Sequence, residues 1–230
     1  MTEPHKNLQS KKTIMFKKFF TLALILVSFA SFGQDNVRKA NKILNQVSRN
    51  YKQLKSLKAT FEMQITEPGA KKPTTEKGTL YLKGNSFKIE MSTVDIICDG
   101  KTQWYYMKDV NEVQITNYDA KSQDISPNTI FTMWDKGFKS IWVSEGNEKG
   151  KATDLIELVP KENQEKKEYT KVKLTIDRVA KDINQCEILF RSGRKMKYIV
   201  TQQVKNVSLA AKFFTFDPAT KPGIQVVDLR

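Results

Sequence analysis

The chain has 230 residues, with 39 Lys and Arg against 25 Asp and Glu and a formal net charge of +14. Its one histidine, His5, lies in a segment that we expect to be removed, which excludes Ser-His-Asp and Cys-His catalysis and the commonest zinc ligand. Basic and acidic residues are interleaved, without a recognition helix, zinc pattern or RNA-binding motif, so we expect no nucleic-acid binding. Carboxylate pairs stay open as catalytic groups, but without a phosphate loop or nucleophile elbow we expect no enzyme, cofactor or metal.

A secretory signal peptide is predicted near the N-terminus. The stretch MFKKFFTLALILVSFASFGQ, which begins at Met15, has two lysines, a short apolar run and a small-x-small cleavage site that ends at Gly33. We therefore expect residues 1–33 to be a signal peptide with an upstream extension, and residues 34–230 to be a single domain. Removal of residues 1–33, with five Lys and one Glu, lowers the net charge to +10. An uncleaved membrane anchor is the alternative.

An amphipathic helix is predicted for residues 35–56. Basic residues cover one side of it, and neither Pro nor Gly interrupts it. Apolar residues recur at spacings of three and four and form one stripe: Val37, Ala40, Ile43, Leu44, Val47, Tyr51 and Leu54.

Short strands should follow, because apolar and polar residues then alternate with a period of two and turn sequences separate the runs. A second, short helix is predicted for residues 126–142, SPNTIFTMWDKGFKSIW, which begins with Ser-Pro and carries several large apolar residues. The predicted strands lie at 59–65, 78–82, 87–91, 95–107 (a hairpin with Asp99-Gly100 in its turn), 113–115, 154–159, 169–177, 183–190, 196–204 and a last aromatic strand through Phe213, Phe214 and Phe216.

These elements predict a mainly β protein with helices (α+β). About ten consecutive short strands favour one strongly curved antiparallel sheet, with the two helices on its concave face. The hairpin DIICDGKTQWYYM (95–107) is apolar on both faces, whereas antiparallel sheets usually expose one polar face to water. The apolar excess implies either a solid core or an apolar pocket between sheet and helices, and composition leaves both open.

Five segments taken in chain order resemble the outer-membrane lipoprotein carrier family, the LolA-like periplasmic chaperones. They are LKSLKATFEMQ, GTLYLKGNSFKIEM, DIICDGKTQWYYM, SPNTIFTM and AAKFFTFDPATKPGIQVVDLR, and the similarity covers about Asn36 to Arg230. The resemblance implies an unclosed β-barrel with a helical lid, whose apolar cavity shields lipoprotein acyl chains. It implies a periplasmic monomer that receives acylated lipoproteins from an inner-membrane, ATP-driven releasing complex. The carrier would then deliver them to an unidentified outer-membrane acceptor, with transient membrane contact.

The resemblance also assigns roles to residues, with no catalytic group among them. Lys83 or Lys88 could replace an arginine that ties lid to barrel in the family. The expected cargo-binding residues are Phe61, Met63, Leu80, Leu82, Phe87, Ile89, Met91, Trp104 and Tyr106, and the expected lid residues are Ile130, Phe131, Met133 and Trp134.

Two points stay open at this stage. Cys98 and Cys186 could form a disulfide in an exported protein or act as small buried hydrophobes. The same scaffold could serve a lipid- or lipoprotein-sensing interaction module, or a carrier of another glycolipid or acylated molecule.

Overall fold

One helix and a 12-stranded sheet dominate the part of the chain that this computed structural model describes, residues 34–119, 134, 137–161 and 167–230. The helix spans residues 34–52, close to the predicted 35–56. The strands are β1 (Leu57–Thr66), β2 (Thr74–Lys83), β3 (Ser86–Met91), β4 (Val94–Cys98), β5 (Thr102–Met107), β6 (Glu112–Asn117), β7 (Phe138–Glu148), β8 (Lys151–Pro160), β9 (Tyr169–Asp177), β10 (Ile183–Phe190), β11 (Lys195–Lys205) and β12 (Gln225–Asp228), with 3-10 helices η2 (Ala211–Phe214) and η3 (Pro218–Thr220).

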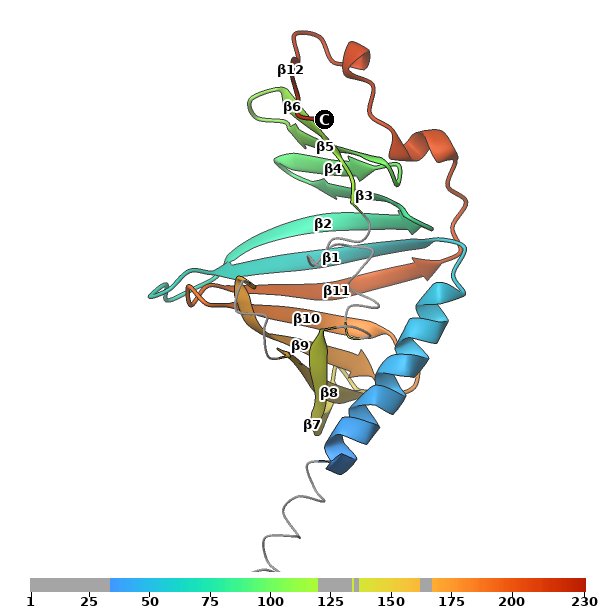
Figure 1. Cartoon of the computed structure of the whole chain (residues 1–230), viewed down its shortest axis with the longest axis vertical. Helices are drawn as coiled ribbons and strands as arrows, with labels where there is room; N and C mark the ends of the chain where they lie inside the picture. The colour runs from blue at the N-terminus through green and yellow to red at the C-terminus, as the bar shows by residue number, and fades with distance from the viewer. Residues whose placement is uncertain (1–33, 120–133, 135–136, 162–166) are drawn as a thin grey trace, which may run out of the picture.

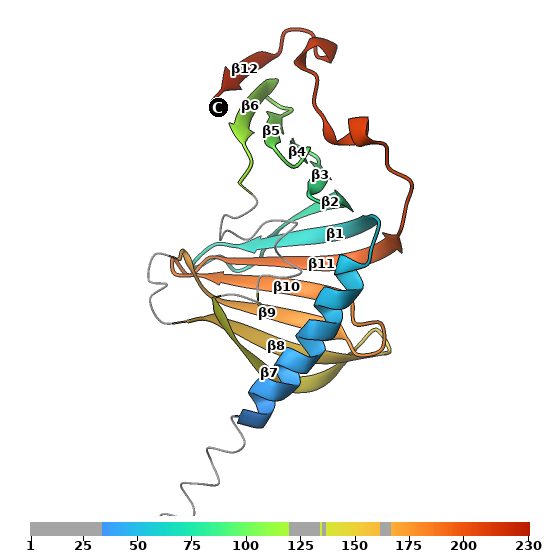
Figure 2. The same cartoon turned by 45° about the vertical axis from the view of Figure 1, so that its right-hand side comes forward.

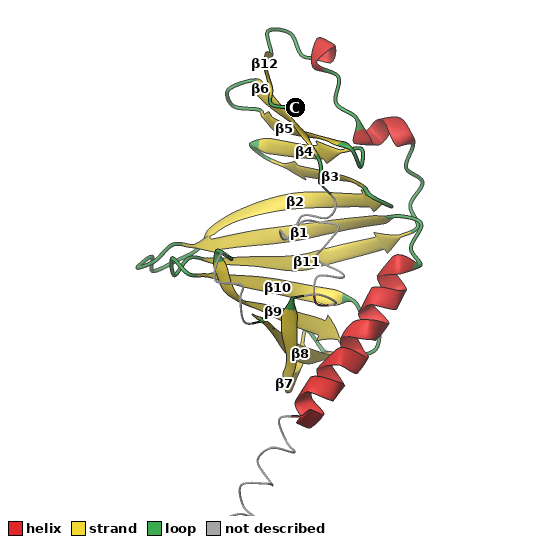
Figure 3. Cartoon of the chain, viewed as in Figure 1, coloured by secondary structure: helices red, strands yellow, loops and turns green. Residues whose placement is uncertain are grey.

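All the strands belong to one sheet, in the order β12-β6-β5-β4-β3-β2-β1-β11-β10-β9-β8-β7. Neighbours are antiparallel except β12 and β6, which run parallel. The two outermost strands, β12 and β7, do not pair with each other, so the sheet twists strongly but stays unclosed (Figures 1 and 3). The predicted mainly β fold with a single, unclosed curved sheet is confirmed.

The helix packs across the β8–β10 half of the sheet, as Figures 1 and 2 show. The predicted stripe is its buried side: Ala40, Leu44 and Val47 are fully buried and Ile43 nearly so. They share a core with branched residues of three strands, among them Ile156, Leu158, Val172, Leu174 and Ile176. Burial of each such side chain contributes roughly 1.5–3 kcal/mol, and this packing holds the helix on the sheet.

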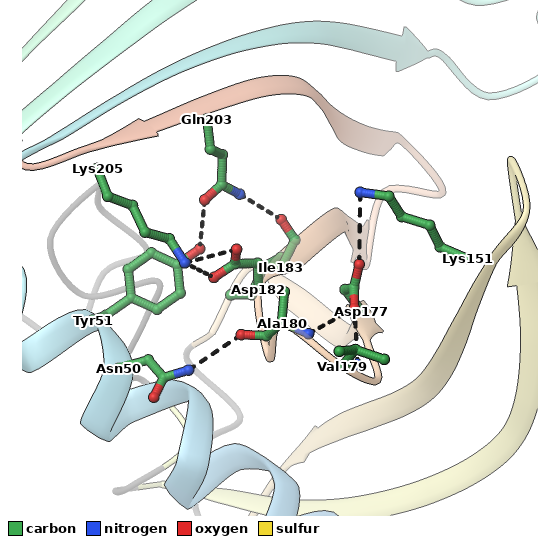
Figure 4. A network of polar contacts seen from close by, with 10 residues as sticks. All are labelled: Asn50, Tyr51, Lys151, Asp177, Val179, Ala180, Asp182, Ile183, Gln203 and Lys205. Carbon is green, nitrogen blue, oxygen red and sulfur yellow. Dashed lines mark hydrogen bonds and ion pairs between the residues drawn. The ribbon is translucent and has the colours of Figure 1, made fainter.

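Polar contacts fix the C-terminal end of the helix (Figure 4). Asn50 donates to the carbonyl of Ala180 in the β9–β10 turn at 3.2 Å, and Tyr51 donates to Gln203 on β11 at 3.4 Å. Nearby, Lys205 bonds Asp182 at 2.7 Å. Burial is the main cause of a pKa of Tyr51 well above its usual range, so this hydroxyl remains a neutral donor.

A second set of contacts fixes the first turns of the helix. The Lys39 ammonium lies 3.4 Å from the centroid of the Trp142 ring and 3.2 Å from the Glu145 carboxylate, both on β7. Arg178 reaches the same carboxylate at 3.0 Å and the buried Asp154 at 3.3 Å. The helix is thus joined to the sheet at both ends.

The two faces of the sheet are distinguished by what covers them. We call the face that carries Ala59, Phe61 and Met63 the helix-side face, because the registers continue it to Tyr198 and Cys186, which contact the helix-side core. We call the opposite face the outer face. After β11 the C-terminal segment, residues 206–224, crosses the outer face and leads to β12 (Figure 2).

Three rings of the C-terminal segment attach it to the outer face. Phe214 is 2% exposed, Phe213 packs edge-on against Tyr81 at 4.8 Å between centroids, and Phe216 packs on Tyr106 at 5.1 Å. The prediction of a strand through Phe213, Phe214 and Phe216 is therefore wrong. Phe213 and Phe214 lie in η2, because a short 3-10 turn lets neighbouring rings reach the same surface, whereas a strand would send them to opposite sides.

The predicted helix at 126–142 is wrong in its last part. Gly137 has φ +81, outside the helical region, and Phe138 begins β7. Phe138 is buried and stacks on Tyr169 of β9, with centroids 6.0 Å apart. The other residues of this predicted helix, Trp134 apart, lie outside the described residues, as does the predicted signal peptide.

Candidate functional site

A group of apolar side chains lies on the helix-side face of β1, β2 and β3. The registers place Phe61 opposite Gly78 and Gly78 opposite Met91, and they align Leu80 with Ile89 in the next row. Phe61, Met63 and Phe87 are buried, whereas the others are half-buried. Seven expected cargo residues therefore share one face: Phe61, Met63, Leu80, Leu82, Phe87, Ile89 and Met91.

Gly78 makes room for the central ring of this group. A Cβ at position 78 would lie 2.4 Å from Cζ of Phe61 and 3.0 Å from Cγ of Met91. The Phe61 ring thus lies over the β2 backbone at Gly78. It also packs edge-to-face against Tyr198 of β11, with 5.8 Å between the ring centroids. Glycine is needed here for close approach of a ring to the backbone.

The apolar face continues onto β4 and β5 through residues that are not among the expected cargo-binding residues. Ile96 pairs with Ile89, and Tyr105 pairs with Ile96, so both lie on the helix-side face. Tyr105 is 37% exposed, unusually open for an aromatic ring. The sequence carries a signal for Ile96 and Tyr105. Short turns join β3 to β4 and β4 to β5, so Ile89, Ile96 and Tyr105 pair across neighbouring strands and their side chains lie on the same face.

Trp104 and Tyr106 are not brought together with the other expected cargo residues. They alternate with Tyr105 and therefore lie on the outer face, where Trp104 pairs with Ile97. Tyr106 is 7% exposed and forms a small core with Val113 and Ile115 under Phe216. Trp104 packs against this small core, and Tyr106 contacts the C-terminal segment through Phe216.

Both lysines proposed as lid contacts also meet the C-terminal segment. Lys83 donates to the carbonyl of Leu209, and Lys88 lies 4.8 Å from the centroid of the Phe213 ring while bonding Glu90 at 2.7 Å. Among the expected lid residues only Trp134 is described. It is buried in the helix-side core, and Ile130, Phe131 and Met133 lie outside the described residues.

Burial raises the pKa of three weakly acidic side chains on this face, Tyr198, Cys98 and Cys186. Desolvation raises the pKa of Tyr198 to about 12. Both cysteines are free and buried; burial raises the pKa of Cys98 to about 11, although the Gly100 N–H partly opposes this, and that of Cys186 to about 12. Where the chain is described, no group of three His, Cys, Asp or Glu could hold a metal ion. The face is thus suited to hydrocarbon, with no reactive nucleophile.

Comparisons with known proteins agree on one family. The family model described as "Outer membrane lipoprotein carrier protein LolA" matches residues 52–217. Proteins named outer-membrane lipoprotein carrier protein from Histophilus somni (strain 2336) and Pectobacterium carotovorum subsp. carotovorum (strain PC1) are 29% and 25% identical to the chain. Each alignment covers 93% of this chain and 98% or 99% of the relative.

A solved structure supports the fold. An uncharacterized conserved protein from Thermus thermophilus matches with a TM-score of 0.56 at 13% identity, over 83% of this chain and 99% of that one. In the described part of the chain no helix has the length and apolar character needed to cross a membrane. Because the family model covers most of the chain and the unclosed sheet with its apolar helix-side face accompanies it, the chain belongs to the LolA family of outer-membrane lipoprotein carrier proteins.

Proposed function

We propose that this protein is a periplasmic carrier that shields the acyl chains of lipoproteins and moves them from the inner to the outer membrane. The acyl chains would lie against the helix-side face of β1 to β5. An inner-membrane, ATP-driven releasing complex would supply the cargo, and an outer-membrane acceptor would receive it. The carrier would act as a monomer and touch membranes transiently.

One observation carries this proposal. Leu80, Leu82, Ile89 and Met91 are only half-buried, although they lie on the same face of the sheet as the helix-covered core. Tyr105 extends the same surface and is more exposed still. A sheet that needed only a core would place such residues where the helix covers them.

The energetics favour a reversible shield. An exposed methylene costs about 0.8 kcal/mol in water, so a chain of about 16 carbons costs roughly 10 kcal/mol. Half-buried side chains have only part of their apolar area left to cover, so the free energy that holds an acyl chain on them is moderate. Such a surface can therefore take up an acyl chain and release it again.

The carrier hypothesis also accounts for the absence of catalytic motifs in the mature sequence. Family carriers perform no covalent step, and binding to a hydrocarbon surface needs none. The proposed site accordingly consists of side chains without nucleophile, base or metal ligand: Phe61, Met63, Leu80, Leu82, Phe87, Ile89, Met91, Ile96 and Tyr105.

The test compares two adjacent residues of β2 that point to opposite faces. We expect Leu80→Gln to weaken binding of a solvatochromic hydrophobic dye and of a triacylated lipoprotein that displaces it. Thr79→Gln, on the outer face, should leave both unchanged. Phe87 is a poor position for the test because it is 1% exposed and a polar substitution would unfold the sheet. If the two folded variants bind the dye and the lipoprotein equally well, the helix-side face is not the cargo site.

A further inference from the structure

We propose that the tips of the β1–β2 and β10–β11 hairpins form one basic surface that docks the protein on an anionic lipid bilayer. The basic tip, as we call it, comprises residues 67–73 and 191–195. This inference deepens the proposed function, since it names the surface that would bring the carrier to a membrane.

The two tips are in contact although they lie far apart in the sequence. Arg194 forms an ion pair with Glu67, with 3.1 Å between Nε and Oε1. A Cβ at Gly193 would lie 3.5 Å from Cγ of Pro68. Figure 1 shows both loops projecting together from the left end of the sheet, far from the C-terminal end of the helix. They form a single protruding surface.

The charge of this surface is strongly unbalanced. The two ranges hold Lys71, Lys72, Arg191, Arg194 and Lys195 against one acidic residue, Glu67, a net charge of +4. The carboxylate of Glu67 is already paired with Arg194. Lys71, Lys72, Arg191 and Lys195 are exposed and form no ion pair with any residue that the structure describes. Their charges therefore remain available to anions in solution.

The apolar helix-side face runs toward this surface. Met63 pairs with Tyr198, and Ile65, one step nearer the tip, pairs with Met196 on β11. Ile65 and Met196 are half-buried, so apolar side chains extend to the last rungs before the loops. A bilayer meeting the basic tip would find hydrocarbon-compatible residues directly behind the charges.

A bilayer fits this surface better than a folded acidic partner. The basic side chains are flexible and at a protruding edge, and the loops carry Pro68, Ala70 and Pro73 in place of large anchoring rings. Protein interfaces are usually anchored by buried aromatic residues. Diffuse attraction of several lysines to anionic headgroups needs no such anchor, and each basic residue near the surface strengthens binding about fivefold.

The experiment is co-sedimentation of the mature protein with vesicles of phosphatidylcholine, alone or mixed with phosphatidylglycerol. We expect binding to the anionic vesicles only, weakened by added salt. Lys71→Gln/Lys72→Gln should bind about 25-fold more weakly. The matched control, Lys55→Gln/Lys101→Gln, removes the same charge from exposed positions at the other end of the sheet and should bind as the parent does.

Several results would overturn the proposal. One is absence of wild-type binding to anionic vesicles, and another is equal loss of binding in both double variants, which would indicate net charge alone. A third is equally tight, tip-dependent binding to polyglutamate, which would indicate an acidic protein partner. Dye displacement by lipoprotein, measured on the same variants, is expected to be normal, so a failure of docking is separable from a failure of the carrier proposal.

Discussion

Replacing Gly78 with alanine should force the Phe61 ring off the backbone of β2. The new Cβ would lie 2.4 Å from Cζ of Phe61, whereas ordinary contacts begin at 3.4 Å, so the ring must move by about 1 Å. Phe61 is held on its other side by Tyr198. Overpacking of this kind costs about 1–3 kcal/mol, and the lower chain entropy of alanine offsets about 0.5–1 kcal/mol of it. We expect a net loss of about 1 kcal/mol in the free energy of unfolding.

The assay is urea and thermal unfolding of the four proteins of a double-mutant cycle. A net loss of about 1 kcal/mol lowers Tm by about 2–4 °C in a domain of this size. In the Phe61→Leu background the same glycine substitution should be neutral or stabilising, a coupling of about 1–2 kcal/mol. A stability increase for Gly78→Ala in the parent, or the same effect in both backgrounds, would refute this account of the face.

Three further predictions concern the cysteines, the C-terminal segment and the helix. Burial raises the pKa of Cys98 from 9.0 to about 11 and that of Cys186 from 9.0 to about 12. At pH 8 the native protein should therefore react with a thiol reagent about a hundredfold more slowly at Cys98, and about a thousandfold more slowly at Cys186, than the protein unfolded in urea. Fast reaction of either cysteine in the native protein would contradict its burial. Phe214→Ala should cost about 3–5 kcal/mol, seen as a lower urea midpoint and faster proteolysis at the C-terminal end, and unchanged cleavage would show that the ring is no anchor. Hydrogen bonds from Lys39 and, to a smaller extent, from Arg178 hold the pKa of Glu145 below 4.5 in the folded protein. The stabilisation from the Glu145 carboxylate is therefore complete above pH 4.5 and is lost as the pH falls through the pKa of Glu145 in the folded protein. Glu145→Gln should abolish that part of the acid dependence of helix hydrogen exchange, and an identical pH profile would contradict the pairing.

Local periodicity was enough to predict most of the elements. The bounds of β9 and β10 agree with the prediction because alternating runs there end at clear turns. The helix stripe was equally readable, since all its buried members face one core. β7 was missed because Phe138, Ile141 and Trp142 also suit a helical spacing, and only Gly137 marks the break.

The faces of the sheet were harder to assign than the strands. Aromatic residues on β5 lie on two different faces of the sheet, and the resemblance that assigns Trp104 and Tyr106 to the cargo residues does not distinguish these faces. Phe216, which packs on Tyr106, comes from more than 90 residues later in the chain. The three phenylalanines of the C-terminal segment alternate irregularly, so no local pattern shows that they pack on the outer face.

Photo-cross-linking on β2 tests the central claim most directly. p-Benzoylphenylalanine would replace Leu80, on the helix-side face, or Tyr81, on the outer face, and the folded protein would be irradiated with an acylated lipoprotein bearing a labelled acyl chain. The carrier account predicts cross-links to the acyl chain from position 80 and none above background from position 81. Equal labelling at both positions, or labelling from position 81 alone, would contradict it.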